Sequence, residues 1–569
     1  MDVNGVSAAS LESSILLRPL IARFCSWLDR GMVCVNGEWT LPDPYESDYS
    51  ENYASANAAA VYAAAMNFSS SPQLRENYRR MMRRSAARAA GLEPNPFCRT
   101  FLVHYSLLGL LMLPEEERGA AVEEFLPPLR EVRDVCDMIN VNCAAMQLST
   151  RLMFAALGAA DGDESGLFRY IDFIQAAQLP DGFINDSIGE KTGVKDLMPI
   201  AYHGFILFIL GCGLVFARRH GVLPAGIDRA ITAVMARGMA WMRRVFSPDG
   251  GFAMCGRSRY QMFTWGVHAA LAAMTAAPEP ALCAIVNRYR QYEKEDGSYS
   301  CTPNFLPHGF RTGFECYTHV NMYNCLGFTG LALAAVLTGG GDMPFGFPPP
   351  LADGGVIDPA AGYAFFRRGG CYFGVSLRDH DAGYTPAMAG FHYLMGPSRL
   401  PLAENRMEGA SPLLEGFATA DGEALRRASI TANVQAKIIP DGLSFEFITG
   451  LGCGRKSIEI YPGRIVWSYE LHAADPAAVV FHTLPLVVSD GKNTLSLRRL
   501  GESALELSFA GCVYRLACSG GRHTALSLRR SLESVSGLAS EAVSEIAPGT
   551  EPGVFRWSVE LRMLSALGR

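Results

Sequence analysis

The hydrophobic period of this chain changes once, and the change limits the possible folds more than any other feature. As far as about Leu337, apolar residues recur at the spacing of one face of a helix. The segment 338–350 is rich in Gly and Pro, a composition that neither a helix nor a central strand tolerates. Beyond it the period is two, as in Arg464-Ile-Val-Trp-Ser-Tyr-Glu-Leu. We therefore predict an α/α toroid over 1–340, a Gly/Pro linker over 341–350 and an antiparallel β-sandwich over 351–569.

The helical region is expected to form an incomplete toroid of helical hairpins. Its apolar stretches are mostly joined by short loops containing Gly, Pro or Asp. Such loops suit paired helices in a ring better than a single bundle. The predicted helices are 11–29, 53–67, 73–91, 97–113, 115–133, 143–158, 164–178, 198–219, 226–246, 259–275, 279–293 and 317–337.

Three of the loops between these helices are related in sequence. They begin Leu179-Pro-Asp-Gly, Ser247-Pro-Asp-Gly and Glu295-Asp-Gly, and each lies between two helical stretches. Loops of one kind at regular places indicate a repeated helical hairpin. Because loops carry function where helices carry packing, we expect the loops at one end of the toroid to form the binding cleft.

Charge and composition exclude several classes of partner. With 49% hydrophobic and 19% charged residues, the 569-residue chain reads as globular with a large interior. A net charge of -6 gives no general attraction to nucleic acid or to anionic membranes, so an anionic substrate must meet a local basic cluster. The N-terminus lacks the features of a signal peptide, and the apolar runs are interrupted by polar residues, which favours a cytoplasmic protein without membrane spans. A periplasmic or secreted protein whose signal had been removed would read the same.

The cysteines argue against disulfides and against a metal centre. There are 15 of them, an odd number, and several lie within apolar runs, so we expect buried free thiols. The sequence has neither a CxxC pair nor an HExxH motif. We expect no metal and no cofactor. The cysteines that lie in apolar runs are Cys25, Cys143, Cys212, Cys283 and Cys325.

Two polar positions in the first half of the toroid are candidate site residues. Asn142 opens a helix, where it is either the N-cap or an amide that donates a hydrogen bond to a substrate carboxyl group. Tyr202 and His203 follow a polar loop and enter an apolar helix. His203 is either a core residue or a neutral imidazole that takes a proton, or orients the phenol that does so.

The loop after Ser247 ends in a basic and aromatic cluster. It supplies Arg257, Arg259, Tyr260 and Gln261 at the start of a predicted helix. Arg binds a carboxylate with two parallel hydrogen bonds, and Tyr can transfer a proton. A solvated basic helix start is the alternative, but cations are unfavourable at the positive end of a helix dipole, so we favour a functional role.

A further cluster precedes the last helix of the toroid and resembles a sugar-binding wall. Its aromatic faces can stack on pyranose rings, and its amide and carboxylate groups can bind sugar hydroxyls. The segment around Trp39 and Tyr45 is either a rim of this wall or an ordinary surface loop. Two histidines in predicted strands, His392 and His482, are expected to make structural hydrogen bonds. The cluster comprises Arg311, Glu315, Tyr317, His319, Asn321 and Tyr323.

The order of toroid and sandwich resembles the polysaccharide lyases of the chondroitin AC, hyaluronate and heparinase II/III type. The motifs are nearest a less characterised bacterial branch with an Asn-Asn-Trp helix start, an Asp-Gly-Trp loop leading to a Tyr-His or Tyr-Tyr pair, and a Gly-Arg-Ser helix start. Here these segments read Asn140-Val-Asn142-Cys, Asp181-Gly-Phe183 with Tyr202-His203, and Gly256-Arg257-Ser258.

The resemblance implies β-elimination from a uronate-containing glycan. Asn142 and Arg257 would neutralise the uronate carboxyl group, His203 would be the base or its helper, and Tyr260 or Tyr202 the acid. Two positions depart from the family pattern: Cys143 replaces the Trp, and Tyr260 lies one position early, where Gln261 would align. The resemblance implies an acidic poly- or oligosaccharide as partner and leaves the oligomeric state open.

Two other functions fit the same fold class. A glycoside hydrolase would need two carboxylates on either side of a glycosidic bond. A non-catalytic carbohydrate-binding or scaffold protein would need no proton-transfer groups in a common cleft. The candidate carboxylates for hydrolysis are Asp181, Asp186, Asp249 and Glu315.

Overall fold

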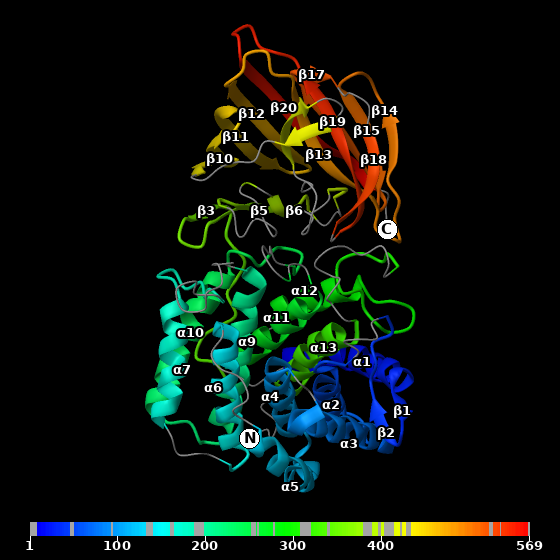
Figure 1. Cartoon of the computed structure of the whole chain (residues 1–569), viewed down its shortest axis with the longest axis vertical. Helices are drawn as coiled ribbons and strands as arrows, with labels where there is room; N and C mark the ends of the chain where they lie inside the picture. Colours follow the sequence, from blue (N-terminus) through cyan, green and yellow to red (C-terminus); the bar gives the residue numbers. More distant parts are fainter. Residues whose placement is uncertain are drawn as a thin grey trace. The chain divides into compact units, whose positions relative to one another are not determined.

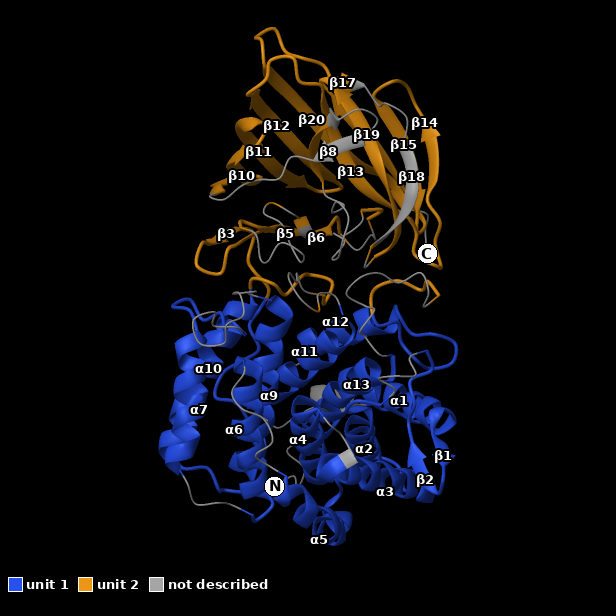
Figure 2. Cartoon of the chain, viewed as in Figure 1, with its two compact units in different colours: residues 1–243, 261–301, 317–349 blue, residues 244–260, 302–316, 350–569 orange. Residues whose placement is uncertain are grey.

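The computed structural model divides into two compact units, each described by itself (Figure 2). Unit 1 comprises 1–243, 261–301 and 317–349, and unit 2 comprises 244–260, 302–316 and 350–569. The residues that the structure describes are 8–45, 51–92, 95–132, 140–159, 164–186, 199–251, 258, 261–276, 279–307, 320–337, 342–378, 388, 390–396, 400–402, 415–421, 424–427, 434–522, 527–534 and 536–566.

In its described residues, unit 1 has six nearly fully buried helices and six that bury one face. Figure 1 shows the outer helices α7 and α10 at one edge of this unit with α6 and α9 inward of them. The inner helices are α2 (Ala54–Ala65), α4 (Pro96–Met112), α6 (Val141–Ala156), α9 (Ile200–Arg219), α11 (Phe263–Met274) and α13 (Val320–Leu337); the outer helices are α1 (Ala8–Gly31), α3 (Pro72–Ala87), which continues into the π-helical turn Arg88–Leu92, α5 (Glu115–Glu131), α7 (Glu164–Ala177), α10 (Ala225–Met242) and α12 (Glu279–Arg290).

The inner helices form a closed ring. Each contacts the next in the order α2, α4, α6, α9, α11 and α13, and α13 contacts α2 in turn. The prediction of an α/α toroid of helical hairpins is confirmed. Sequence periodicity identifies helices and their buried faces, whereas closure depends on which buried faces meet.

Close backbone approach seals the ring at its small residues. A Cβ added at Gly266 of α11 would lie 1.9 Å from the carbonyl oxygen of Gly327 in α13. A Cβ at Gly213 of α9 would lie 2.7 Å from Cα of Ser149 in α6. Both distances are shorter than any real contact, so only glycine permits these helix pairs to pack so closely.

The three related loops adopt one conformation. In each, an N–H donates to the carbonyl oxygen four residues later: Leu179 to Phe183 (2.7 Å), Ser247 to Gly251 (2.8 Å) and Lys294 to Ser298 (2.9 Å). The turns contain Gly182, Gly250 and Gly297 at φ of 107°, 81° and 82°, a region that favours glycine. An aspartate accepts from the N–H two residues later in each turn, at Asp181, Asp249 and Asp296. The repeated-hairpin prediction is thereby confirmed.

The most apolar inner helices would suit a membrane span by length and hydropathy alone. They are α9 and α13, and 94% and 89% of their apolar windows are buried inside the structure. Their apolar character is therefore accounted for by the interior of the ring.

The described cysteines form no disulfide. Cys143, Cys212 and Cys325 are buried in the inner helices α6, α9 and α13.

Unit 2 is an antiparallel β-sandwich, as predicted. Its largest sheet has eight strands in the order β14-β15-β16-β20-β12-β11-β10-β9, and the other sheets run β17-β19-β13-β7-β8, with β18 on β19, and β3-β4-β5-β6. The strands are β3 (Gly354–Asp358), β4 (Tyr363–Arg368), β5 (Cys371–Ser376), β6 (Gly390–Leu394), β7 (Gly416–Asp421), β8 (Ala424–Arg427), β9 (Gln435–Ile439), β10 (Gly442–Thr449), β11 (Gly452–Tyr461), β12 (Arg464–Ala473), β13 (Val480–Ser489), β14 (Ser496–Arg499), β15 (Ala504–Phe509), β16 (Cys512–Ser519), β17 (Gly521–Arg522), β18 (Ser527–Ser534), β19 (Gly537–Ile546) and β20 (Val554–Ala566); unit 1 has a small hairpin of β1 (Val33–Val35) and β2 (Glu38–Thr40).

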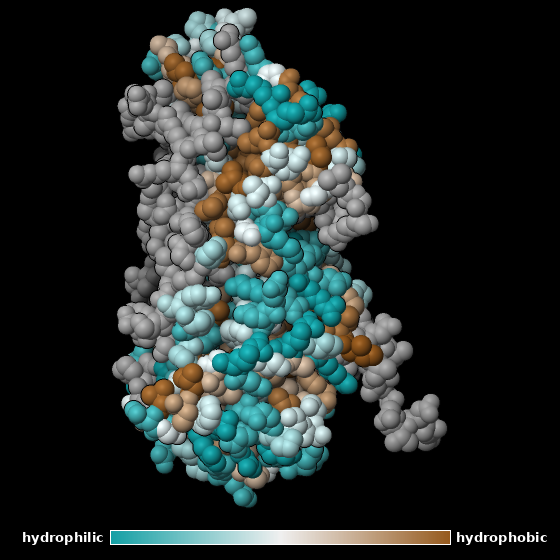
Figure 3. Space-filling model, turned by 90° about the vertical axis from the view of Figure 1, so that its right-hand side faces the viewer, coloured by the Kyte–Doolittle hydropathy of each residue, from teal (hydrophilic) through white to brown (hydrophobic). Residues whose placement is uncertain are grey.

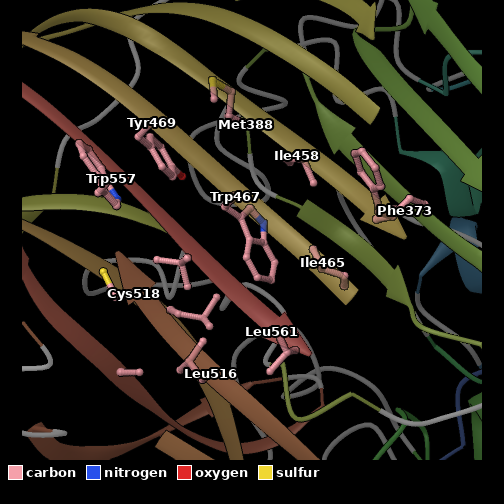
Figure 4. Close-up of a cluster of buried hydrophobic side chains, with 14 of the residues drawn as sticks. Phe373, Met388, Ile458, Ile465, Trp467, Tyr469, Leu516, Cys518, Trp557 and Leu561 are labelled. Carbon is pink, nitrogen blue, oxygen red and sulfur yellow. The ribbon is translucent and has the colours of Figure 1, made fainter. Parts of the chain in front are cut away.

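The core of the sandwich follows from period-two alternation. In β12, Ile465, Trp467, Tyr469 and Leu471 face inward, and the intervening residues lie on the outer face of the sheet. Figure 4 shows Ile465, Trp467 and Tyr469 among other inward side chains from β5, β11, β16 and β20. On the side of the molecule drawn in Figure 3, the coloured surface residues are mainly hydrophilic, and apolar patches lie between them.

An ion pair is buried inside this sandwich. Lys456 of β11 donates to Glu415, and their side chains are 1% and 6% exposed. Tyr469 also donates to Glu415 at 2.5 Å, and its ring stacks on Trp557 with centroids 4.7 Å apart. Burial raises the pKa of Tyr469, and the adjacent Glu415 raises it further. The carboxylate therefore joins Lys456 and Tyr469 of one sheet to the segment that leads into β7.

The division into units corrects the predicted domain boundaries. The predicted change of fold near 340–350 is observed, but 244–260 and 302–316 lie within the predicted toroid sequence and belong to unit 2. The predicted helix 226–246 ends at Met242, because the chain leaves the helix before the turn at Ser247. A helical period cannot reveal that a loop between two helices packs with another unit.

Candidate active site

The first turns of the inner helices meet at one end of the ring, which we call the mouth. Its floor is an aromatic row of Tyr53, Phe101, Phe205, Phe263 and Tyr323, which come from α2 or its N-cap, α4, α9, α11 and α13. Successive ring centroids are 4.5, 6.2, 5.7 and 5.4 Å apart. Because α6 separates α4 from α9 in the ring, the contact of Phe101 with Phe205 passes on the inner side of α6.

Asn142 lies at the mouth but does not cap its helix. The N-cap is Asn140, whose side chain accepts from the Cys143 N–H at 3.0 Å, so the predicted N-cap position of Asn142 is wrong by two residues. Asn142 instead donates its backbone N–H to Asp186 at 2.9 Å and its amide to the same carboxylate at 3.4 Å. Its amide oxygen is buried and accepts no hydrogen bond from the described residues.

His203 is an interior residue with a defined tautomer. Its Nδ1 accepts from the Ile184 N–H at 3.0 Å, so its Nε2 carries the proton and donates to the Gly238 carbonyl oxygen at 3.1 Å. The ring stacks on Phe183, and the side chain is 0% exposed. Both nitrogens are occupied by the backbone, which favours the packing alternative over a role as base. Its neighbour Tyr202 is partly exposed and meets Phe205 edge-on at 6.4 Å.

Three more candidate residues also lie at the mouth. Asn321 donates its amide to the Leu41 carbonyl oxygen at 3.5 Å and its N–H to Asp43 at 2.9 Å. Tyr323 belongs to the aromatic row, and Gln261 is 1% exposed, with its backbone carbonyl oxygen accepting from the Thr264 hydroxyl at 2.6 Å. These side chains are buried, so they shape the mouth more than they present themselves to solvent.

The remaining candidates fall outside the described residues. They are Arg257, Arg259, Tyr260, Arg311, Glu315, Tyr317 and His319. The segment that carries Arg257 and Tyr260 belongs to unit 2, and its described residue Ser258 has a positive φ of 63°.

Unit 2 places a histidine beside the turn that precedes this segment. Nε2 of His392, on β6, lies 4.0 Å from Asp249 of the turn, and its ring meets Tyr372 edge-on with centroids 5.5 Å apart. His392 is 5% exposed. The other strand histidine, His482, accepts from the Trp557 indole N–H at 3.2 Å, the structural hydrogen bond that we expected.

The described carboxylates proposed for hydrolysis stabilise local structure. Asp181 and Asp249 accept backbone N–H groups within their own turns. Asp186 accepts from the start of α6 and is 5% exposed. The fourth, Glu315, lies outside the described residues. Among the described residues, no group of three or more His, Cys, Asp and Glu side chains is arranged to hold a metal ion.

At the mouth, the carboxylates of Asp186 and Asp43 already accept from the first N–H groups of α6 and α13, whereas three other inner helices begin without a side-chain cap. Within the described part of the chain, no side chain caps the N-termini of α2, α9 or α11. Free N–H groups and the helix dipole both favour negative charge at such ends. Tyr202 lies in the first turn of α9, so its phenol is close to one of these positive ends.

Below the mouth, two buried histidines make the stability of unit 1 depend on pH. Burial lowers the pKa of His104 to about 3 and that of His268 to about 3, with His203 lowering the second further. Because these pKa values are below that of an unfolded histidine, the stability they confer is complete above pH 6.5 and is lost as pH falls toward 3. From pH 7 to pH 5 each should cost about 2 kcal/mol.

Thermal unfolding at the two pH values measures this loss. A His104→Asn variant removes one titrating group and should unfold with about half the pH dependence. An unchanged pH dependence in the variant would contradict the role of His104.

Sequence reasoning missed the aromatic row and the Asp186 bridge. An aromatic residue in an apolar helix reads as an ordinary core residue. The five aromatic residues of the row differ from other core aromatics only because each lies in the first or second turn of its helix or at its N-cap. This signal becomes visible once the inner helices are known. Asp186 lay in a recognised loop, but its partner is 44 positions away.

Comparison with known proteins shows the fold. No protein-family model and no curated protein matches the sequence. Among solved structures, heparinase III matches with a TM-score of 0.50 at 10% identity, over 100% of this chain and 86% of that one. A Streptomyces coelicolor chondroitin AC lyase matches with 0.47 at 12% identity, over 97% and 80% of the two chains. An unsaturated glucuronyl hydrolase mutant from a streptococcus matches with 0.38 at 12% identity, over 59% and 96%. The chain therefore has the polysaccharide lyase fold of an α/α toroid and a β-sandwich.

Proposed function

We propose that this chain, with its polysaccharide lyase fold, cleaves a uronate-containing glycan by β-elimination. The observation that carries the proposal is the mouth of the ring, where α9 and α11 begin without a side-chain cap and the partly exposed Tyr202 lies in the first turn of α9. Uncapped helix N-termini beside a proton-transfer group suit an acidic sugar.

The reaction needs three kinds of group. The C5 proton of a uronate is too weakly acidic to be removed until the neighbouring carboxylate is neutralised. A base then takes that proton, the bond from C4 to the bridging oxygen breaks, a C4–C5 double bond forms and an acid protonates the leaving oxygen. In the proposal, Arg257 and Asn142 bind the carboxylate, and Tyr202 or Tyr260 transfers the protons.

The environment of His203 changes the role that the resemblance implied. With both nitrogens bonded to the backbone, His203 has no lone pair free for a substrate proton. It adjoins Tyr202 in α9 and is fixed between Ile184 and Gly238. We therefore propose that His203 is a positioning residue for Tyr202.

One assay separates elimination from hydrolysis. The protein is incubated with hyaluronan, chondroitin sulfate, heparan sulfate and polyuronates, and ultraviolet absorbance and reducing ends are measured together. Elimination yields an unsaturated product that absorbs in the ultraviolet, whereas hydrolysis yields reducing ends alone. Turnover of no acidic glycan would overturn the proposal and leave a binding protein.

An Arg257→Ala variant should lose at least about 10²–10³-fold in turnover, because nothing else proposed at the site can mask the carboxylate with a full positive charge. Arg257→Lys is the matched control, which keeps the charge but loses bidentate binding and should be intermediate. Steady-state kinetics measure the loss, and circular dichroism checks that the fold is kept. Wild-type turnover in the alanine variant would show that Arg257 has no such role.

A further inference from the structure

Asp186 supplies the acceptors for two of the first three N–H groups of α6. Val141 donates to the backbone carbonyl oxygen of Asp186 at 2.9 Å, and Asn142 donates to its carboxylate at 2.9 Å. The third N–H, that of Cys143, donates to the side chain of Asn140 at 3.0 Å. The N–H groups of a first turn have no partner within their own helix, so these bonds satisfy the start of α6 without a ligand.

The same carboxylate also fixes the orientation of the Asn142 amide. Nδ2 of Asn142 donates to the second carboxylate oxygen of Asp186 at 3.4 Å. A carboxylate only accepts, so the amide nitrogen must face it and the amide oxygen must point away. That oxygen is buried and accepts no hydrogen bond from the described residues. A buried acceptor without a donor costs free energy, which a donor group on a bound ligand would recover.

The backbone leading to Asp186 is held by hydrogen bonds of its own. Ile184 donates its N–H to Nδ1 of His203 at 3.0 Å, and Asn185 donates its N–H to the carbonyl oxygen of Ala177, at the end of α7, at 3.1 Å. The Asp186 side chain is 5% exposed. Because both preceding residues are bonded to other elements, Asp186 can hold the amide in place instead of following its movements.

The start of α13 has a similar aspartate that does not hold an amide. Both helices begin with Val-Asn, and Asp43 accepts from the Asn321 N–H at 2.9 Å, as Asp186 does from Asn142. Asp43 is 8% exposed. The Asn321 amide, however, donates to two backbone carbonyl oxygens and not to Asp43. Asp43 therefore supports the backbone of a helix start, whereas Asp186 supports a helix start and orients a side chain.

We propose that Asp186 is a positioning residue for Asn142, which it holds so that the amide oxygen accepts from a hydroxyl of the bound glycan. A uronate carboxylate cannot donate to this oxygen, so a sugar hydroxyl supplies the donor. The second N–H of the amide is then left for the carboxylate. The choice of a glycan rests on the proposed function, but the coupling between the two side chains requires no turnover.

A double-mutant cycle separates this role from support of the helix. In Asp186→Asn the new amide can donate as well as accept, so either orientation of the Asn142 amide finds a partner. The Kd of a glycan oligosaccharide should therefore rise about 3–10-fold. Asn142→Ala also weakens binding, but it keeps the backbone N–H that Asp186 accepts. In the Asn142→Ala background, Asp186→Asn should cause no further loss.

Asp43→Asn is the matched control, because it removes the other buried carboxylate that accepts from a helix start. It should leave Kd unchanged and lower the melting temperature about as much as Asp186→Asn does. Titration calorimetry of the full chain with oligosaccharides of hyaluronan, chondroitin sulfate, heparan sulfate and polyuronates measures Kd, and steady-state kinetics give kcat and KM for any that are cleaved. If Asp186→Asn does not fold, Asp186→Glu keeps the charge, displaces it by a methylene group and takes its place in the cycle.

The outcomes distinguish this role from the proposed activity. Wild-type Kd in Asp186→Asn, or an equal loss in the presence and absence of the Asn142 amide, would overturn the positioning role even if the enzyme is active. Glycan binding that shows the expected coupling, but without turnover, would support the role of Asp186 while overturning the proposed lyase activity. Binding of none of the glycans would overturn both.

Discussion

A Tyr202→Phe variant is expected to lose about 10²–10⁴-fold in turnover of a uronate glycan, the usual contribution of a positioned acid or base. The change removes one hydroxyl and keeps the ring that meets Phe205, so the packing of the mouth should be preserved. Because the substitution leaves the carboxylate-binding groups in place, kcat should fall far more than KM rises.

Tyr170→Phe is the matched control for this variant. Tyr170 lies on the outer helix α7, where its hydroxyl accepts from Arg151 at 3.3 Å, and its loss should leave kcat unchanged. If Tyr202→Phe kept wild-type kcat, the proton-transfer role would pass to Tyr260 or to another residue. A large fall in melting temperature would instead show that the Tyr202 hydroxyl supports the fold.

A Glu415→Ala variant is expected to destabilise unit 2 by about 3–5 kcal/mol, because Lys456 would remain buried without its counterion. Tyr469 would also lose the acceptor of its buried hydroxyl. At about 2–4 °C per kcal/mol for a unit of this size, its melting temperature should fall by roughly 6–20 °C. Differential scanning calorimetry of the full chain measures the shift.

Removing both charges should restore most of this stability. In a Glu415→Leu/Lys456→Met variant no charge is left buried, and apolar side chains of similar size can replace an ion pair at little cost. If Glu415→Ala melted like the wild type, Lys456 would have found another partner or water. If the double variant were no more stable than Glu415→Ala, the ion pair would contribute more to the stability of the sandwich than the neutralisation of its own buried charges.

Local patterns in the sequence predicted much of the fold. The change of hydrophobic period separated toroid from sandwich because a helix and a strand bury different sets of positions. The Asp-Gly turns were recognisable because their glycines need positive φ and their aspartates accept the turn's own N–H groups. Such features depend on residues a few positions apart, and so they can be read directly.

Features made by distant residues could not be predicted in this way. Alternation places Lys456 on the same face as Ile458 and Ile460, but nothing nearby identifies Glu415 as its partner 41 positions earlier. The order of the eight-stranded sheet likewise depends on distant residues, because β20 lies between β12 and β16, which are both far from it along the chain.

For the candidate site, the sequence indicated helix starts but not the surroundings of each side chain. All six described candidates lie in the first turns of inner helices or just before them, because polar residues ahead of an apolar helix mark its exposed end. Their roles depended on backbone groups that no side-chain pattern reveals. Ile184 and Gly238 occupy both nitrogens of His203, and Asp186 takes the backbone N–H of Asn142.

The assignment of two toroid loops to unit 2 has a consequence for how this architecture can be divided. The main chain passes from one unit to the other five times, at 243/244, 260/261, 301/302, 316/317 and 349/350. A single cut in the Gly/Pro linker leaves the two loops on the helical fragment, so it yields neither unit whole. Exchanging the sandwich for another at that linker would likewise separate it from its two loops, because these precede the linker in the chain. Separating the toroid from the sandwich therefore requires cuts on both sides of each loop as well as one in the linker.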